Sequence, residues 1–285
     1  MVKISYSQYS TWKQCPWKFK LSYIDNNRIF APNIHLIFGS SIHLTLQKYL
    51  SIFYMTNEKK ANELNMFKFL KEAMISEYNK YTDKGHIDFA TLDEFNEFYA
   101  DGVEIINFFK KRRADYFPKK DHVLIGCEVP INYKLKDELV FNGYLDVVIK
   151  NIKTHRIKII DFKKSYSGWR PKAANDKVKR SQLQMYKIFY SKEFNIPINN
   201  IDVEFLILKQ KVYETPMGFP GKRIQRVVPP TGKITMNVVN KNINEFVDII
   251  FDDGVYNKDS EYIKNPDINI CKWCPYNLRP DLCQK

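Results

Sequence analysis

The sequence has no run of apolar residues long enough to cross a lipid bilayer. Its first residues also lack the apolar segment of a secretory signal peptide. We find no internal repeat and no low-complexity segment either. These absences argue against a membrane protein and a secreted one. They predict a cytoplasmic protein whose cysteines stay reduced instead of forming disulfides.

Acidic residues are scarce relative to basic ones. The chain has 32 Asp and Glu against 45 Lys and Arg, so its formal net charge is +13, and its pI is about 9.3. Such a surplus favours a polyanionic partner, and nucleic acid before a membrane surface. The alternative is that a biased genome rich in Lys, Asn and Ile codons produces the charge. With 44% hydrophobic residues, the 285-residue chain can bury the core of one large domain.

The apolar pattern divides the chain into three segments of one predicted domain. Residues 1–120 are mostly helical, 121–230 form the sheet-bearing core, and 231–285 hold a last helix and a tail with three cysteines. This order predicts an α/β or α+β domain with a helical N-terminal elaboration. The helices are expected at 17–24, 38–54, 60–81, 92–117, 174–194 and 233–251, and the strands at 123–135, 138–150, 156–163, 203–212 and 223–228.

Charged residues end one of the predicted strands in a pattern that suggests chemistry. The apolar run before Asp161 is followed by Lys163, and residues two apart on a strand point to the same face. Asp146 ends a second apolar run on the preceding strand. Two such carboxylates can share a Mg²⁺ ion, which polarises a phosphodiester and activates a water molecule, while the lysine orients the water or neutralises charge. The alternative is an exposed strand end with solvated charges.

A basic helix follows this strand. Gln182 and Tyr186 are four residues apart, which places them on one helix face. Glutamine can bind a phosphate or a base edge, and tyrosine can stack on a base. Lys177, Lys179 and Arg180 make the start of the helix strongly basic. Taken alone, this pattern also fits an ordinary surface helix.

The cysteines are grouped in a way that suggests a metal. Cys271 and Cys274 form a C-x2-C pair, and Cys283 follows in the same tail. Cys15, beside a proline near the other end of the chain, is the natural fourth ligand. Iron–sulfur and zinc both suit this spacing, and the alternative is three unconnected thiols in the tail. Cys127 lies within a predicted strand and is interpreted as a small buried apolar residue.

Together these motifs resemble those of the RecB-like nucleases of the PD-(D/E)XK superfamily, nearest to their iron–sulfur branch, which includes recombination nuclease domains and CRISPR-associated RecB-like exonucleases. The resemblance covers nearly the whole chain. Each motif is short, but six occur in the family's order. They are the segment that opens with Cys15-Pro-Trp-Lys-Phe, the G-x-x-x-H segment from Gly39 to His43, the G-x-x-D segment from Gly143 to Asp146, Asp161-Phe-Lys163, the Q-x-x-x-Y pair of Gln182 and Tyr186, and the cysteines of the tail.

The resemblance implies a fold and a metal centre. The fold is a restriction-endonuclease-like α/β core, with a central mixed sheet flanked by helices. Catalytic Mg²⁺ or Mn²⁺ would be bound by His43, Asp146, Asp161 and the backbone carbonyl of Phe162. Lys163 would orient the attacking water. His43, which on its own is more typical of a structural histidine, gains a role only through this resemblance.

The resemblance also implies how DNA and a second metal are held. Gln182 and Tyr186, with the basic Arg180, would hold DNA near the metal, and Glu128 would help to position a metal-bound water. A 4Fe-4S cluster would act as a structural staple, with Zn²⁺ as the alternative, because the last cysteine gap is longer than is usual in the family. Its ligands would be Cys15, Cys271, Cys274 and Cys283.

The implied function is that of a metal-dependent deoxyribonuclease. It would be an exonuclease on DNA ends or single strands, in recombination, repair or phage DNA processing within a bacterial or phage-infected cell. A helicase, recombinase or other DNA-processing protein is a candidate partner. The rival hypothesis is a non-catalytic nucleic-acid-binding or assembly subunit that keeps the fold. The complete set of two acids and a lysine favours the enzyme.

Overall fold

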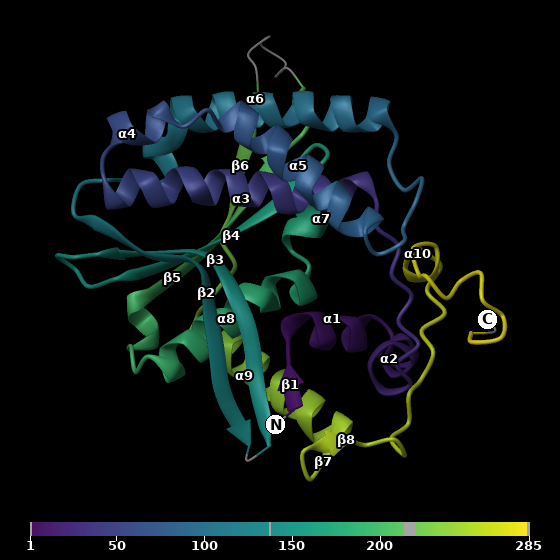
Figure 1. Cartoon of the computed structure of the whole chain (residues 1–285). Helices are drawn as coiled ribbons and strands as arrows, with labels where there is room; N and C mark the ends of the chain where they lie inside the picture. The colour runs from purple at the N-terminus through teal and green to yellow at the C-terminus, as the bar shows by residue number, and fades with distance from the viewer. Residues whose placement is uncertain (1, 137, 214–220, 284–285) are drawn as a thin grey trace.

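A mixed β-sheet lies at the centre of the molecule, with helices on both of its faces (Figure 1). The computed structural model describes residues 2–136, 138–213 and 221–283. Within them, the strands pair in the order β1 (Val2–Ile4), β3 (Leu139–Asn151), β4 (Ile157–Ser165), β5 (Ile201–Lys209) and β6 (Ile224–Val227), and β2 (His122–Lys136) pairs with β3. The β1–β3 and β4–β5 pairs are parallel, and the others are antiparallel.

Apolar side chains alternate along the strands and build a separate core on each face of the sheet. On β4, Ile157 and Ile159 belong to one core, while Ile160 and Phe162 belong to the other. Full burial of each such side chain contributes about 2 kcal/mol. The first core is covered by α1 (Tyr6–Gln14), α8 (Lys177–Glu193) and α9 (Lys233–Ile250), and the second by α3 (Ile34–Met55), α5 (Met66–Thr82) and α6 (Leu92–Tyr116) (Figure 1).

Shorter elements connect these layers. They are α2 (Pro16–Phe19), the π-helix η1 (Lys20–Ile24), α4 (Glu58–Glu63), α7 (Pro171–Ala174), the 3-10 helix η2 (Ile198–Asn200), the paired strands β7 (Phe251–Asp252) and β8 (Val255–Tyr256), and α10 (Ile268–Cys271). None of the helices in the described residues is long and apolar enough to cross a membrane.

The predicted α/β class, with its central mixed sheet and helical N-terminal elaboration, is confirmed. The strands expected at 123–135, 138–150 and 156–163 correspond to β2, β3 and β4. β5 differs from the prediction, because it begins at Ile201 and ends at Lys209. Most of the stretch between the strands expected at 203–212 and 223–228 falls on 214–220, which lies outside the described residues.

Three helix predictions were wrong in their bounds, and a capping side chain explains each difference. Asn33 accepts a hydrogen bond from the backbone of the first turn at 3.1 Å, so α3 begins at Ile34 and Gly39 lies inside the helix instead of at its start. The helix expected at 60–81 is interrupted because Asn65 caps a new one, α5. Asp176 likewise begins α8 after the separate short helix α7.

The strands β3 and β4 separate at one end. Their ladder ends at the pair Val147 and Ile160, whereas β4 continues beside β5 as far as the pair Ser165 and Lys209. The segment 161–163 therefore has a paired strand on one side only. The helices α3 and α8 contact β4 from opposite faces of the sheet, so side chains from both can reach this open edge.

Candidate active site

Two carboxylates lie at the point where β3 and β4 separate. Asp146 and Asp161 are the next residues on the two strands after the last ladder pair. The Asp146 Oδ2 atom accepts a hydrogen bond of 2.7 Å from the backbone N–H of Phe162. The Asp146 side chain on β3 thus accepts the hydrogen bond from the β4 backbone that a backbone carbonyl would accept in a regular ladder. The structure brings together the two acids that the sequence predicted to share a site.

Lys163 faces the same side as Asp161, as the strand alternation predicts. Its Nζ lies 2.7 Å from Asp161 Oδ2, and only 3% of the Asp161 side chain is exposed. This oxygen nevertheless receives no hydrogen bond of good angular geometry from the described residues. The two charges are in contact, but the buried oxygen keeps unused capacity to bind a proton, a water molecule or a cation.

The charges of the two acids are poorly compensated. Burial raises the pKa of Asp161 to about 6, against the opposing effect of the Lys163 charge, and the Asp146 charge raises it further. Burial also raises the pKa of Asp146 to about 6, with Lys163 again opposing. Two carboxylates close together in a low-dielectric site disfavour each other's ionised form. A cation bound between them would relieve this cost.

His43 approaches the carboxylates from α3. Its Nδ1 lies 3.4 Å from Asp146 Oδ2, and its ring packs near that of Phe162. Burial lowers the pKa of His43 to about 4, although the Asp161 charge partly offsets this. The imidazole is therefore neutral at physiological pH. Its contact with Asp146 is not an ion pair, and a ring nitrogen keeps a lone pair for a metal.

These donors fit a divalent cation in their chemistry. Carboxylate oxygens suit Mg²⁺ and Mn²⁺, and Asp161 offers an oxygen without a hydrogen bond from the described residues. As the side chains stand, however, no group of three or more His, Cys, Asp or Glu residues in the described ranges is arranged to hold a metal ion. Lys163 occupies the place beside Asp161. Binding of a cation would therefore require this lysine to move.

Gln182 and Tyr186 reach the site from α8, on the opposite face of the sheet from His43. The Gln182 Nε2 atom donates to Asp161 Oδ1 at 3.1 Å and to the Tyr186 hydroxyl at 3.3 Å. Burial raises the pKa of the Tyr186 hydroxyl. A Cβ on Gly143 would lie 3.0 Å from the Tyr186 ring, so a glycine there gives this ring room. Of the predicted pair, Gln182 therefore contacts Asp161 directly, and Tyr186 contacts Gln182.

Arg180 has a different position from these two residues. Its Nε donates to the Ala174 carbonyl at 2.7 Å, and its Nη2 donates to the Asn175 side chain. These contacts tie the guanidinium to the turn between α7 and α8. The structure therefore holds Arg180 beside the start of α8 and not against the carboxylates.

The cysteine segments of the two chain ends lie side by side. The backbone N–H of Asn265 donates to Cys15 Sγ at 3.4 Å, and Cys271 Sγ donates to the Asn265 carbonyl at 3.5 Å. Burial raises the pKa of Cys283, Lys264 opposes this shift, and Cys274, Cys15 and Cys271 add to it, so the four thiols are near enough to interact electrostatically. The tail includes the short helix α10, which ends at Cys271.

Cys127, interpreted from the sequence as a small buried apolar residue, is partly buried and packs against the core beneath α3. Its Sγ lies 3.7 Å from both the Gln47 carbonyl and the Ser51 hydroxyl. It belongs to that core and not to the other four cysteines.

Sequence reasoning missed Gln47. This side chain is 5% exposed on α3, and it donates hydrogen bonds to Glu128 and to the backbone of Asp146. The available signal was its spacing, because Gln47 lies one helical turn after His43 and so shares its face.

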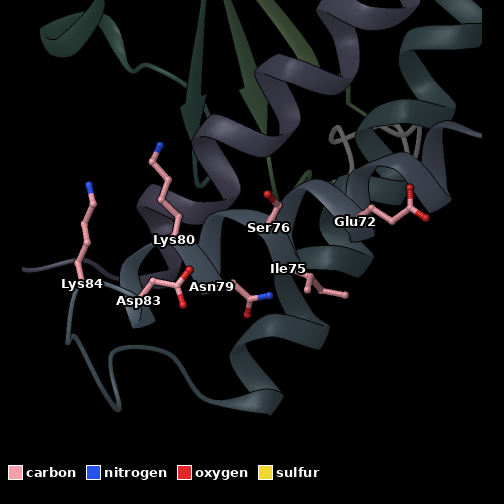
Figure 2. Close-up of a pocket in the computed structure, with 7 residues that line it drawn as sticks. All are labelled: Glu72, Ile75, Ser76, Asn79, Lys80, Asp83 and Lys84. Atoms are coloured by element: carbon pink, nitrogen blue, oxygen red, sulfur yellow. The ribbon is translucent and has the colours of Figure 1, made fainter.

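A pocket of about 650 Å³ lies on the outer face of α5 and the turn that follows it (Figure 2). It is lined by Glu72, Ile75, Ser76, Asn79, Lys80, Asp83 and Lys84. These seven residues belong to no predicted motif, and they lie on a different element from either carboxylate. We therefore locate the site by its chemistry and assign no role to this pocket.

Comparisons with known proteins bear on the whole chain. The family model described as the PD-(D/E)XK nuclease superfamily matches residues 3–283. No curated protein matches the sequence. Among solved structures, one titled "Crystal structure of SSO0001" is similar at 12% identity, covering 94% of this chain and 96% of that one with a TM-score of 0.31, which is too low to support an argument. The family match spans nearly the full length and includes both diverging strands, and we conclude that the chain belongs to the PD-(D/E)XK nuclease superfamily.

Proposed function

We propose that this protein is a Mg²⁺- or Mn²⁺-dependent exonuclease of the RecB-like type, which hydrolyses phosphodiester bonds at DNA ends or in single strands. Membership in the superfamily supports a metal-dependent nuclease in general. The observation that carries the proposal is the meeting of Asp146, Asp161 and Lys163 where β3 and β4 separate. The three proposed segments of the domain, 1–120, 121–230 and 231–285, would act as one nuclease unit.

The metal would be held by His43, Asp146 and Asp161. The backbone carbonyl of Phe162 is a suitable fourth donor. Since a strand residue directs its N–H and C=O to the same side, and this N–H bonds Asp146, the carbonyl faces the same gap. When bound, the ion would polarise the scissile phosphate and lower the pKa of a water molecule.

The protein's own side chains would prepare the reaction. Gln182 holds one oxygen of Asp161, which leaves the second directed toward Lys163. Once released from Asp161, the Lys163 ammonium would orient the attacking water and offset negative charge that develops on the phosphate. His43 stays neutral, so it can act as a ligand and not as an acid.

DNA would be held by α8 and by the positive charge of the protein. Gln182 and Tyr186 adjoin the carboxylates, and Arg180 stands near the start of the same helix. With a net charge of +13, the chain suits a polyanion. A helicase, recombinase or other DNA-processing protein is a fitting partner for such an exonuclease, and the cytoplasm is its fitting location.

The four neighbouring cysteines would ligate a 4Fe-4S cluster. The closeness of the chain ends and the N–H···S contact at Cys15 support this proposal. Because the sulfurs in the described residues are not arranged as a metal site as they stand, ligation would draw them together. Protein purified without oxygen is expected to be brown and to absorb near 400 nm. A colourless protein with stoichiometric zinc would replace the cluster by the zinc alternative.

Cleavage of labelled DNA tests the catalytic proposal. The wild type should shorten linear single- or double-stranded DNA with Mg²⁺ or Mn²⁺ and lose this activity in EDTA. The variants Asp161→Ala and Lys163→Ala should each be slower by at least about 100-fold while remaining folded. End-blocked and circular substrates should resist if the enzyme is an exonuclease. The proposal would be overturned if the wild type failed to cut with every divalent ion tested, or if both variants cut normally.

A further inference from the structure

Glu128 has a backbone conformation that is unusual for its position. It lies within β2, between Cys127 and Val129, which pair in regular register with Val147 and Leu145 of β3. Its φ is nevertheless +51°. Residues other than glycine rarely adopt this left-handed region, and they keep it only where neighbouring contacts enforce it. Glu128 stands opposite the catalytic Asp146, and a contact with a neighbouring side chain is needed to hold its backbone in this conformation.

Gln47 supplies contacts on both sides of this irregular position. Its Nε2 atom donates to Glu128 Oε1 at 2.6 Å and to the backbone carbonyl of Asp146 at 3.1 Å. One buried amide thus joins a side chain of β2 to the backbone of β3. It does so from α3, one turn beyond His43.

The Glu128 carboxylate lies close to the site, because the same Gln47 amide nitrogen bonds both its Oε1 atom and the backbone carbonyl of Asp146. Glu128 is itself exposed, and within the described ranges its carboxylate accepts a hydrogen bond from Gln47 alone. Gln47 holds the Oε1 atom, and no hydrogen bond from the described residues reaches Oε2.

The amide is chemically suited to this task. Its NH₂ group has two hydrogens, one for each acceptor, and no charge. A lysine in its place would neutralise Glu128, and a glutamate would repel it. The amide positions the carboxylate and leaves its negative charge available for a cation.

We propose that Gln47 is a positioning residue, which holds Glu128 beside Asp146 and His43 as a third carboxylate of the metal site. This inference rests on the proposed function, because it concerns the same cation. The carboxylate would accept a hydrogen bond from a water molecule on the ion, or bind the ion itself. Gln47 touches neither the cation nor the DNA, and it acts through Glu128.

The variant Gln47→Met tests this role, because methionine has a similar size and no hydrogen-bond donor. We expect Mn²⁺ binding, measured by calorimetry without DNA, to weaken by about 10-fold or more. The kcat should fall by a similar factor, while the KM for DNA stays unchanged. The matched control is Gln184→Met, because Gln184 is equally buried on α8 and bonds only the Pro230 carbonyl among the described residues. It should bind Mn²⁺ and cut DNA as the wild type does.

A double variant separates positioning from general support of the fold. If Gln47 acts through Glu128, then adding Gln47→Met to Glu128→Ala should cause no further loss of Mn²⁺ affinity. Should Gln47→Met fail to fold, Glu128→Gln keeps the shape and removes the charge, and it should show the same loss. Wild-type affinity in Gln47→Met, or independent effects in the double variant, overturns the inference alone. A wild type that binds no Mn²⁺ and cuts no DNA overturns the proposed function as well.

Discussion

At the scale of single residues, the site holds two buried carboxylates whose charged forms are unfavourable. Asp146 and Asp161 are held close together although both pKa values are raised by burial, and Gln182 fixes one of them in place. The spacing of Asp161 and Lys163 predicted their common face, because strand alternation is local. Gln47 could not be predicted in this way, since its partners lie 81 and 99 residues away in the sequence.

The pH dependence of stability should reveal this cost. The pKa of Asp161 is about 6 in the folded protein against 3.8 ordinarily, so the folded state binds its proton more tightly. Stability is therefore lost as the pH rises from about 4 to about 6, and it stays lost above that range. In EDTA at pH 7.5, Asp161→Asn should be more stable than the wild type by roughly 1 kcal/mol. Thermal unfolding at several pH values measures this.

The stability gained by Asp161→Asn should shrink as the pH falls toward 4, where Asp161 is protonated in the wild type. Asp248→Asn is the control, because Asp248 is an exposed partner of Lys136 and its replacement should change little at any pH. If Asp161→Asn were less stable than the wild type at every pH, the ion pair with Lys163 would outweigh burial.

At the scale of elements, strands were easier to predict than helix ends. The alternation in β2, β3 and β4 extends over many residues, so errors at single positions do not matter. A helix end depends on one side chain. The caps at Asn33, Asn65 and Asp176 were each overlooked, because asparagine and aspartate are equally common in turns. The start of α3 matters most, because this helix carries His43 and Gln47.

Removal of the α3 cap should therefore be measurable. Asn33→Ala removes the hydrogen bond to the Leu36 backbone and should lower the free energy of unfolding by about 1 kcal/mol. Asn33→Asp keeps an acceptor and should restore most of the loss. Urea unfolding of the three proteins measures both effects. Equal losses in the two variants would mean that the side-chain acceptor is not what stabilises this helix end.

At the scale of the whole molecule, the C-terminal tail lies beside α2, near the start of the chain (Figure 1). Trp17 Nε1 donates to the Leu282 carbonyl at 3.0 Å, and Asn265 contacts Cys15. The cysteine spacing predicted this closure, because four thiols on one metal would need it. The cysteine spacing gave no indication of the apolar and polar contacts that hold the tail. These involve Tyr276, which belongs to no motif.

Tyr276 should anchor the tail even when no metal is bound. Its side chain is 1% exposed, and its hydroxyl donates to the Asn27 carbonyl at 3.0 Å and lies 2.9 Å from the Ser22 hydroxyl. Tyr276→Ala should lower the free energy of unfolding by about 3 kcal/mol in chelator, through the cavity and the lost hydrogen bonds.

Trp273→Ala is the matched control from the same tail, because Trp273 is 79% exposed and its loss should change stability by less than about 0.5 kcal/mol. Urea unfolding and limited proteolysis of the tail distinguish the two variants. If both behaved like the wild type in chelator, the tail would be docked by its metal alone, and the closure of the chain would depend on the cysteines.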